Sequence, residues 1–150
     1  MAGLIWHAQP TAEIALVAAT VKTLLQIVAP ANQVILIHEV GIAFDGVAAT
    51  DEPIIVDILR QTTAGTSTSH TLLKRDSGRA ETIQATCGKN HSVEPTAGDI
   101  LYSREIHPQR GELIIFPIMR PIWVPGGTRL AIRATAPNNV NAIPFILAEE

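Results

Sequence analysis

The stretch VILIHEVGIAFDG, residues Val34–Gly46, has the composition and the alternation of a long buried β-strand. Its β-branched residues favour an extended backbone, and Asp45-Gly46 provides a turn after it. Because side chains two residues apart share a face of a strand, one face is expected to carry His38 together with the apolar residues Val34, Leu36, Val40, Ile42 and Phe44. We expect the rest of the chain to pair with this strand or to pack on it.

The segment Thr11–Pro30, which precedes this strand, fits two patterns. Its apolar residues fall on a helical stripe, yet in the second half they also alternate with polar residues. Many β-branched residues and the closing Pro30 favour two strands, roughly Glu13–Ala19 and Val21–Val28. We therefore predict two strands here and keep a helix as the alternative.

Six runs after the central strand are predicted to be strands, because turn residues bound them. Polar loops are expected at Thr62–His70 and at Gly88–Gly98. The predicted strands are Pro53–Thr63, Glu81–Cys87, Asp99–His107, Glu112–Met119, Thr128–Ala136 and Ala142–Ala148.

Two of these strands carry an expectation about their place in a sheet. Glu112–Met119 is almost entirely apolar, which predicts a strand that is covered on both faces. Ala142–Ala148 contains Pro144, which has no N–H to donate to a strand ladder and therefore indicates an edge strand.

The order of these elements predicts an all-β fold. Short strands follow one another with turn signals between them, no strand–helix–strand alternation is visible, and 150 residues suit one domain. We predict an antiparallel β-sandwich or jelly roll of about eight or nine strands, formed by residues 12–150. Residues 1–11 are expected to be a short N-terminal arm.

The composition indicates that partners cover some apolar surface. Hydrophobic residues make up 47% of the chain, charged residues make up 17%, and the mean hydropathy is +0.24. The charged fraction of an ordinary soluble domain is about 25%. The alternative is a monomer whose core is rich in Ala and Ile.

Charge and cysteine content exclude several classes of function. A net charge of −3 and the lack of a basic tract argue against direct binding of nucleic acid. The single cysteine, Cys87, excludes an intramolecular disulfide and is compatible with a reducing cytoplasm. The start of the chain does not match a signal peptide, and charged residues interrupt Ala12–Ala31, so no membrane partner is expected.

The titratable residues lack the spacing of a catalytic or metal-binding set. No two of the five histidines lie two or four residues apart, and adjacent His38 and Glu39 point to opposite faces of a strand. Glu105 and His107 share a face and are the better pair, but a solvated pair at the rim explains them. We expect no catalytic residue, no bound metal, no cofactor and an inert, buried Cys87.

Aromatic residues supply the candidates for contacts with a partner. An aromatic side chain in a terminal arm needs a docking place, either on its own domain or on a neighbour. The candidate interface residues are Trp6, His7 and Trp123.

Five segments, taken in order, carry a resemblance to a known class of protein. They are KTLLQIVAPANQ (22–33), GIAFDG (41–46), EPIIVDILRQTTAGT (52–66), EPTAGDIL (94–101) and GGTRLAIRATAP (126–137). In the order and texture of these segments, residues 11–150 resemble the head decoration, or cement, proteins of tailed bacteriophages, which have jelly-roll-like domains.

This resemblance implies a structural virion protein without enzymatic activity. Proteins of this class sit on the outer surface of an icosahedral head, commonly as homotrimers, and clamp neighbouring subunits of the major capsid protein. The resemblance therefore implies assembly in the host cytoplasm and a place on the outer capsid surface. It also implies an N-terminal arm that reaches to a neighbour, and no catalytic residues.

Two other functions remain as alternatives. A β-sandwich binding module of a tail or fibre would recognise a glycan or a receptor at a concave site lined by Trp123, Tyr102 or neighbouring polar residues. A degenerate cupin-like metalloenzyme would use His38, Glu105 and His107.

Overall fold

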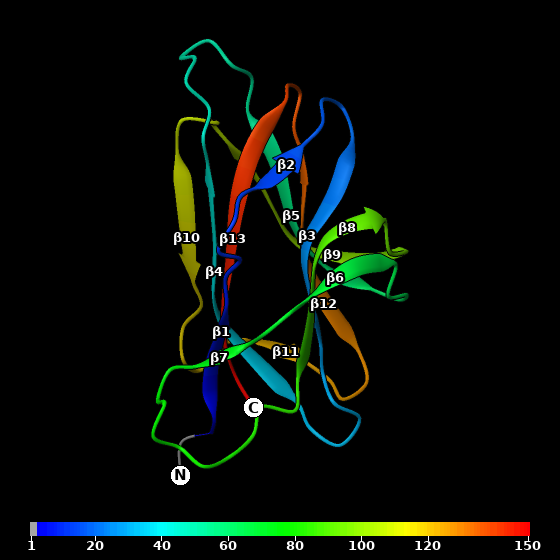
Figure 1. Ribbon diagram of the computed structural model, residues 1–150, viewed down its shortest axis with the longest axis vertical. Coiled ribbons are helices and arrows are strands. Elements are labelled where there is room, and N and C mark those ends of the chain that lie inside the picture. Colours follow the sequence, from blue (N-terminus) through cyan, green and yellow to red (C-terminus); the bar gives the residue numbers. More distant parts are fainter. Residues whose placement is uncertain (1–2) are drawn as a thin grey trace.

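The fold is built from strands alone. The computed structural model describes residues 3–150, in which thirteen strands form two antiparallel sheets and no helix is present (Figure 1). The sheets face each other across one hydrophobic core. The predicted all-β antiparallel sandwich is confirmed, although its strands are more numerous than the eight or nine expected. Within these residues, nothing helical is long and apolar enough to cross a membrane.

Seven strands form the first sheet, here called sheet A, and six form the second, sheet B. In hydrogen-bonding order, sheet A contains β10 (Gly111–Ile115), β4 (Ile35–Phe44), β13 (Val140–Glu149), β1 (Ile5–Ala8) and β7 (Leu73–Lys74). Two short strands join this sheet, β11 (Ile122–Val124) beside β4 and β2 (Ile14–Leu16) beside β13. Sheet B contains β6 (Thr66–His70), β8 (Thr86–Val93), β3 (Val21–Val28), β12 (Arg129–Thr135), β5 (Ile54–Gln61) and β9 (Ala97–Ile106).

The connections give this sandwich the topology of a jelly roll. The chain passes from β2 in sheet A to β3 in sheet B, back to β4 and again to β5. After β9 it returns to β10, crosses to β12 and ends in β13. The resulting orders, β10-β4-β13-β1 and β3-β12-β5-β9, are those of an eight-stranded jelly roll. Strands β6, β7 and β8 extend one edge of each sheet.

Alternating apolar residues of both sheets fill the core. Two strands lie at Ile14–Leu16 and Val21–Val28, so the prediction of strands rather than a helix in this region is confirmed. The largest fully buried core side chains are Trp6, Leu16, Leu24, Leu25, Ile27, Ile35, Ile37, Ile54, Ile58, Leu130 and Ile132.

The central strand β4 is present, but its inward face changes part-way along. Ile37 is buried in its first half, whereas Val40 is buried in its second half. The register with β13 shifts at this point, between Leu147 and Ala148. This β-bulge places one extra residue in β4. Odd-numbered residues therefore point into the core before the bulge, and even-numbered residues point into it afterwards. The prediction of one apolar face along the whole of Val34–Gly46 is therefore wrong.

The expected N-terminal arm contributes a strand to the sandwich. Ile5–Ala8 forms β1, which pairs with β13 on one side and with β7 on the other. Trp6 points into the core and is fully buried, because a large aromatic side chain finds its docking place on its own domain. The prediction of an arm over residues 1–11 is wrong for this strand, and residues 1 and 2 lie outside the described part.

Two predicted loops also contain strands. Part of Thr62–His70 forms β6, and part of Gly88–Gly98 belongs to β8, with which β6 pairs. Both strands are rich in Ser, Thr and other polar residues, so alternation of apolar side chains does not mark them.

The predicted edge strand lies inside a sheet. β13 is flanked by β4 on one side and by β1 and β2 on the other. Pro144 lies opposite Ile42 of β4, in the interval between the pairing with β2 and the pairing with β1. A residue without an N–H is tolerated there because no strand pairs with that side of β13 at this position.

The outer side of sheet B carries buried polar side chains that bond one another. Gln26 Nε2 donates to Gln61 Oε1 at 2.7 Å, and Gln61 Nε2 donates to Thr23 Oγ1 at 2.8 Å. Thr23 Oγ1 donates to Glu94 Oε2 at 2.7 Å. Gln26 also donates to the carbonyl oxygen of Thr63 at 3.0 Å. The segment that follows β5 therefore covers this face and satisfies its polar groups.

Acidification is expected to destabilise the fold through His91, which is buried in the same cluster. Its Nδ1 lies 3.2 Å from the carbonyl oxygen of Thr23, and burial lowers the pKa of His91 below its usual value. Below a pH of about 6.5 the unfolded chain binds a proton at His91 more readily than the folded chain does. The free energy of unfolding therefore decreases as the pH is lowered. Burial also lowers the pKa values of His7 and His70, which adds to the same slope.

Urea unfolding between a pH of about 7.5 and a pH of about 5.5 measures this dependence. Each histidine contributes at most about 1.4 kcal/mol per pH unit. The variant His91→Gln is expected to show a flatter profile than the parent protein, whatever its stability at neutral pH. A free energy of unfolding that rises on acidification over this interval would contradict the prediction.

Candidate functional site

Exposed apolar side chains gather at one edge of sheet A. Leu113 and Ile115 of β10 are 54% and 65% exposed, and Trp123 of β11 is 59% exposed. Ile118 and Met119, in the loop between these strands, are 85% and 90% exposed. We call these five residues the β10–β11 surface. β10 is the outermost strand at the left of Figure 1.

Residues of the neighbouring strands continue this surface across the outer face of sheet A. Each cross-strand row begins at an exposed residue of the β10–β11 surface, and the first two rows end at a half-buried apolar residue of β13. The rows given by the pairing registers are Ile115–Glu39–Leu147, Leu113–Gly41–Phe145 and Trp123–Leu36–Glu149.

Gly41 allows the apolar side chains to close over β4. A Cβ atom at this position would lie 3.2 Å from Leu113 Cδ1 and 3.5 Å from Phe145 Cβ. A larger residue would push these two side chains apart. The small residue in the middle of β4 therefore makes the edge and the centre of the face one apolar surface.

The two outer faces of the sandwich differ in how they are covered. The chain itself covers the centre of sheet B, where Gln26 donates to the carbonyl oxygen of Thr63 at 3.0 Å, whereas Ile55 of β5 and Ile100 of β9 are 43% and 52% exposed. On sheet A, residues 3–150 leave the β10–β11 surface open to solvent. An open strand edge with apolar side chains is typical of a surface that associates with another chain.

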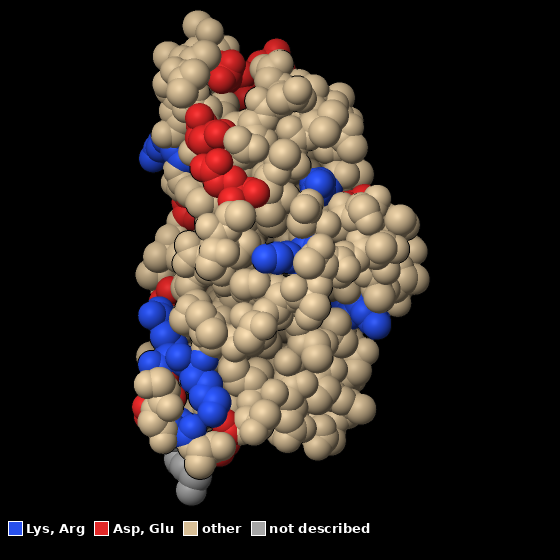
Figure 2. All heavy atoms as spheres, viewed as in Figure 1, with Lys and Arg blue, Asp and Glu red and all other residues tan. Residues whose placement is uncertain are grey.

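Two charged pairs lie near this surface, whereas Glu39 and Arg120 form no ion pair within residues 3–150. His38 Nε2 lies 3.0 Å from Glu149 Oε2, and Gly3 N donates to Glu149 Oε1 at 2.6 Å. At the edge of β10, Arg104 Nε lies 3.7 Å from Glu112 Oε1. Figure 2 shows acidic side chains gathered in the upper half of the visible face, and the largest basic group at the lower left, where Figure 1 places β7 and its loop.

The three predicted interface residues have different environments. Trp123 is exposed and belongs to the β10–β11 surface. Trp6 is buried in the core and is not available to a partner, so its prediction as a contact residue is wrong. His7 is half-buried, and its ring centroid lies 6.2 Å from that of Phe145.

The other four residues of the β10–β11 surface were not predicted from the sequence. The prediction that Glu112–Met119 is covered on both faces is wrong, because β10 is an edge strand that ends at Ile115 and the next residues form a loop. A signal was present, since residues 113–124 contain one charged residue, Arg120. An uncharged apolar run does not distinguish burial inside a domain from burial against another chain.

The histidines considered for metal binding have local hydrogen-bond partners. His38 is bonded to Glu149, and His107 Nε2 lies 3.3 Å from the carbonyl oxygen of Ala49. Across residues 3–150, no three His, Cys, Asp or Glu side chains form a group that could hold a metal ion. Cys87 is buried, and burial raises the pKa of its thiol to about 12.

Tyr102 is engaged by its own neighbours. Arg104 lies over its ring, with Cζ 4.7 Å from the centroid, and Arg104 Nη2 donates to the Tyr102 hydroxyl oxygen at 2.8 Å. Phe116 packs edge-to-face against the same ring, with 6.3 Å between centroids. These contacts occupy the ring that a sugar-stacking site would need.

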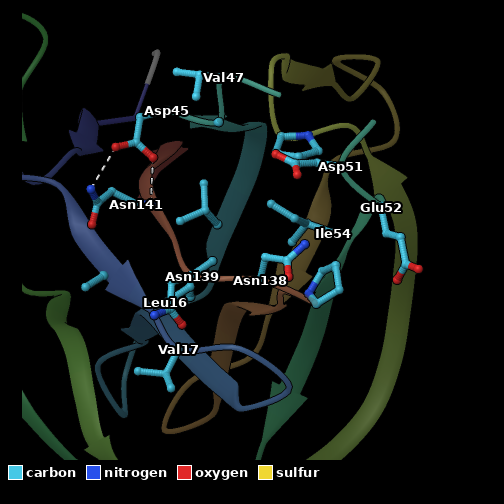
Figure 3. Close-up of a pocket in the computed structure, with 15 residues that line it drawn as sticks. Leu16, Val17, Asp45, Val47, Asp51, Glu52, Ile54, Asn138, Asn139 and Asn141 are labelled. Carbon is cyan, nitrogen blue, oxygen red and sulfur yellow. Dashed lines mark hydrogen bonds between the residues drawn. The ribbon is translucent and has the colours of Figure 1, made fainter. Parts of the chain in front are cut away.

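A cleft of about 410 Å³ opens at one end of the sandwich, between the β4–β5 loop and the β12–β13 turn (Figure 3). Asp45 accepts hydrogen bonds from Asn141 N and Nδ2, both at 2.7 Å, and this bonding lowers the pKa of Asp45. Asp51 lies on the rim of the cleft. Trp123 and Tyr102 are not among its lining residues, so the predicted aromatic site and this cleft are separate.

Comparisons with known proteins return no match. No protein-family model matches the chain, and no curated protein and no solved structure is found to be similar to it.

Proposed function

We propose that this protein is a structural decoration, or cement, protein of a tailed-bacteriophage head, without enzymatic activity. It binds the outer capsid surface as a homotrimer and stabilises the contacts between subunits of the major capsid protein. It assembles in the host cytoplasm and remains part of the virion. The observation that supports this proposal best is the β10–β11 surface, an apolar strand edge that a jelly-roll sandwich leaves exposed.

An apolar surface of this kind suits a protein that works by association. Exposed apolar patches mark interaction sites, and permanent interfaces are more apolar than transient ones. Three linked copies present three capsid-binding surfaces at once, and each bound copy raises the effective concentration of the next. Such a protein needs strong contacts between chains and no turnover.

Stabilisation of the head follows from linkage. A protein that binds the assembled shell, and not its separated subunits, shifts the equilibrium towards the shell. At a free concentration of 100 times the Kd, each bound site contributes about 2.7 kcal/mol. The contribution is largest where one trimer joins several capsid subunits.

Addition of the purified protein to undecorated heads is expected to raise their melting temperature in a saturable manner. Calorimetry of the heads measures the shift, sedimentation measures binding, and heads that already carry decoration protein are the control. Light scattering of the free protein is expected to give three times the chain mass of 16.1 kDa. A monomer that leaves the melting temperature of the heads unchanged would contradict the proposal.

The cleft at the end of the sandwich favours a second candidate function, a glycan- or receptor-binding module of a tail or fibre. Its volume of about 410 Å³ falls in the range of small-ligand pockets, and its amide and carboxylate groups suit sugar hydroxyls. A thermal-shift screen against a glycan panel tests this function. A shift that Asp51→Ala abolishes, in a protein that ignores heads, would favour it over the decoration role.

A further inference from the structure

We propose that the β10–β11 surface is the interface between copies of this chain, and that the capsid-binding surface lies elsewhere on the molecule. This inference rests on the homo-oligomer of the proposed function, but it does not depend on capsid binding. Four observations support it: the regularity of the β10 edge, the scarcity of charge, the available area, and the smaller apolar surface of sheet B.

β10 has the properties of an edge that is covered in the assembled protein. Its pairing with β4 is regular over Gly111–Ile115, with no shift of register. Its sequence, GELII, contains neither Lys nor Pro. Lys, Pro and β-bulges are the usual means by which a monomeric protein protects an edge strand. This edge has none of these three. Its one charged residue, Glu112, is half-buried and lies 3.7 Å from Arg104, whereas Leu113 and Ile115 are exposed beside it.

The scarcity of charge favours a second copy over a partner that is made separately. Arg120 is the one charged residue of residues 113–124. A surface that binds a separately folded partner is exposed to water until the complex forms. Such a surface has about the same polarity as the rest of the protein surface. Copies of one chain cover one another as soon as they fold, so their shared interface can be as apolar as a domain core.

The available area matches what a stable interface needs. Burial of a Leu, Ile or Met side chain removes roughly 60–120 Å² of apolar surface, and a Trp removes about 150–250 Å². The β10–β11 surface with Phe145 and Leu147 therefore offers on the order of 600 Å² per copy. A standard interface buries about 800 Å² per partner, of which about 65% is apolar in homodimers.

Sheet B offers a smaller apolar surface. Its edge strand β9 is open as well, but its exposed large apolar residues are Ile100 and Leu101, at 52% and 38%, its pairing with β5 shifts register twice, and it carries Asp99, Arg104 and Glu105. The centre of the outer face of sheet B is covered by the segment after β5, and the polar groups of Gln26, Gln61 and Thr23 are bonded beneath it. A second copy would find there a face that the chain has already closed. Sheet A, with the regular and apolar edge at β10, is therefore the side that association can bury.

Ile115→Asp and Ile118→Asp test this inference directly. Both side chains are mostly exposed in the single chain, so a charge there leaves the fold intact, whereas in an apolar interface it is buried without a partner. We expect the dissociation constant of the oligomer to rise roughly tenfold or more for each variant. Light scattering over a dilution series measures this change, and circular dichroism checks the fold.

Val93→Asp is the matched control. Val93 is also β-branched, lies on a strand and is 57% exposed, against 65% for Ile115, but it belongs to β8 in sheet B. β8 and β10 lie on opposite sides of the molecule in Figure 1. The control variant is expected to keep the mass of the parent protein.

Cross-linking gives a second reading that does not require an Asp variant to stay soluble. Cys87 is the one cysteine of the chain and is buried, so a new surface cysteine is the reactive thiol. A short bismaleimide is expected to join copies of Ile118→Cys into covalent oligomers. Val93→Cys is expected to give none.

Each outcome decides a different point. An oligomer whose mass survives Ile115→Asp and Ile118→Asp, with no cross-link at position 118, overturns this interface and leaves the decoration role standing. An oligomer that these variants dissociate, but that ignores heads, supports the interface and overturns the decoration role. A monomer in which bound heads protect Ile118→Cys from alkylation places the capsid on this surface and overturns the inference.

Discussion

Replacement of Trp6 with alanine is expected to lower the free energy of unfolding by about 3–5 kcal/mol. Trp6 is fully buried between the sheets, and removal of its indole leaves a cavity that β1, held between β13 and β7, cannot collapse to fill. Urea unfolding monitored by far-UV circular dichroism measures the loss. This effect would show that the start of the chain stabilises the domain.

Two comparison variants give this result its meaning. Leu73→Ala lies next to β1 on β7 but removes an exposed side chain, so a change within about 0.5 kcal/mol is expected. Trp6→Phe is expected to lose only about 1–2 kcal/mol, because within residues 3–150 the buried Trp6 Nε1 has no hydrogen-bond partner and Phe removes that group. A Trp6→Ala variant as stable as Leu73→Ala would mean that β1 is a detachable arm.

The variant Arg133→Leu is expected to lose about 3 kcal/mol. Arg133 of β12 donates to Asp57 Oδ2 of β5 from Nη2 at 2.7 Å and from Nε at 3.3 Å, and both side chains are mostly buried. Without the guanidinium, a buried carboxylate keeps only the hydrogen bond from Ser103 Oγ at 2.8 Å. Removal of one partner of a buried ion pair leaves a desolvated charge, which is the source of the loss.

The double variant Asp57→Leu/Arg133→Leu is the test of this explanation. Removal of both charges takes away the desolvated carboxylate, so the stability is expected to return to within about 1 kcal/mol of the parent protein. Ser103 is exposed and bonds to water instead. If the double variant is less stable than Arg133→Leu, packing of the two long side chains, and not their charge, is what matters at this point of sheet B.

The strands that were predicted correctly are those in which the local pattern is enough. β12 alternates between buried Leu130 and Ile132 and the half-buried Arg129 and Arg133, as its sequence indicates. β3 was recognised by its β-branched residues, although a helical stripe was also present. A period of two is a property of the extended backbone, and it is therefore visible before any tertiary contact is known.

Predictions failed where the answer depended on a distant part of the chain. Pro144 indicated an edge, but β13 lies in the middle of sheet A because its partner on one side changes from β2 to β1. The bulge in β4 shifts the buried face by one residue, and no single residue type marks it. β1 has the same alternation as the long strands, but with four residues it is too short to be recognised by pattern alone.

The amino-acid sequence by itself determined that this chain is an antiparallel β-sandwich, that it is rich in apolar residues and poor in charged ones, and that Cys87 forms no internal disulfide. Only the tertiary structure decided which of the apolar residues are buried and which are exposed. It buried Trp6 and exposed the β10–β11 surface, although both are apolar in the sequence. The physical reason is that hydropathy sets how strongly a side chain avoids water, while the order of strands in a sheet decides whether its own domain can cover it.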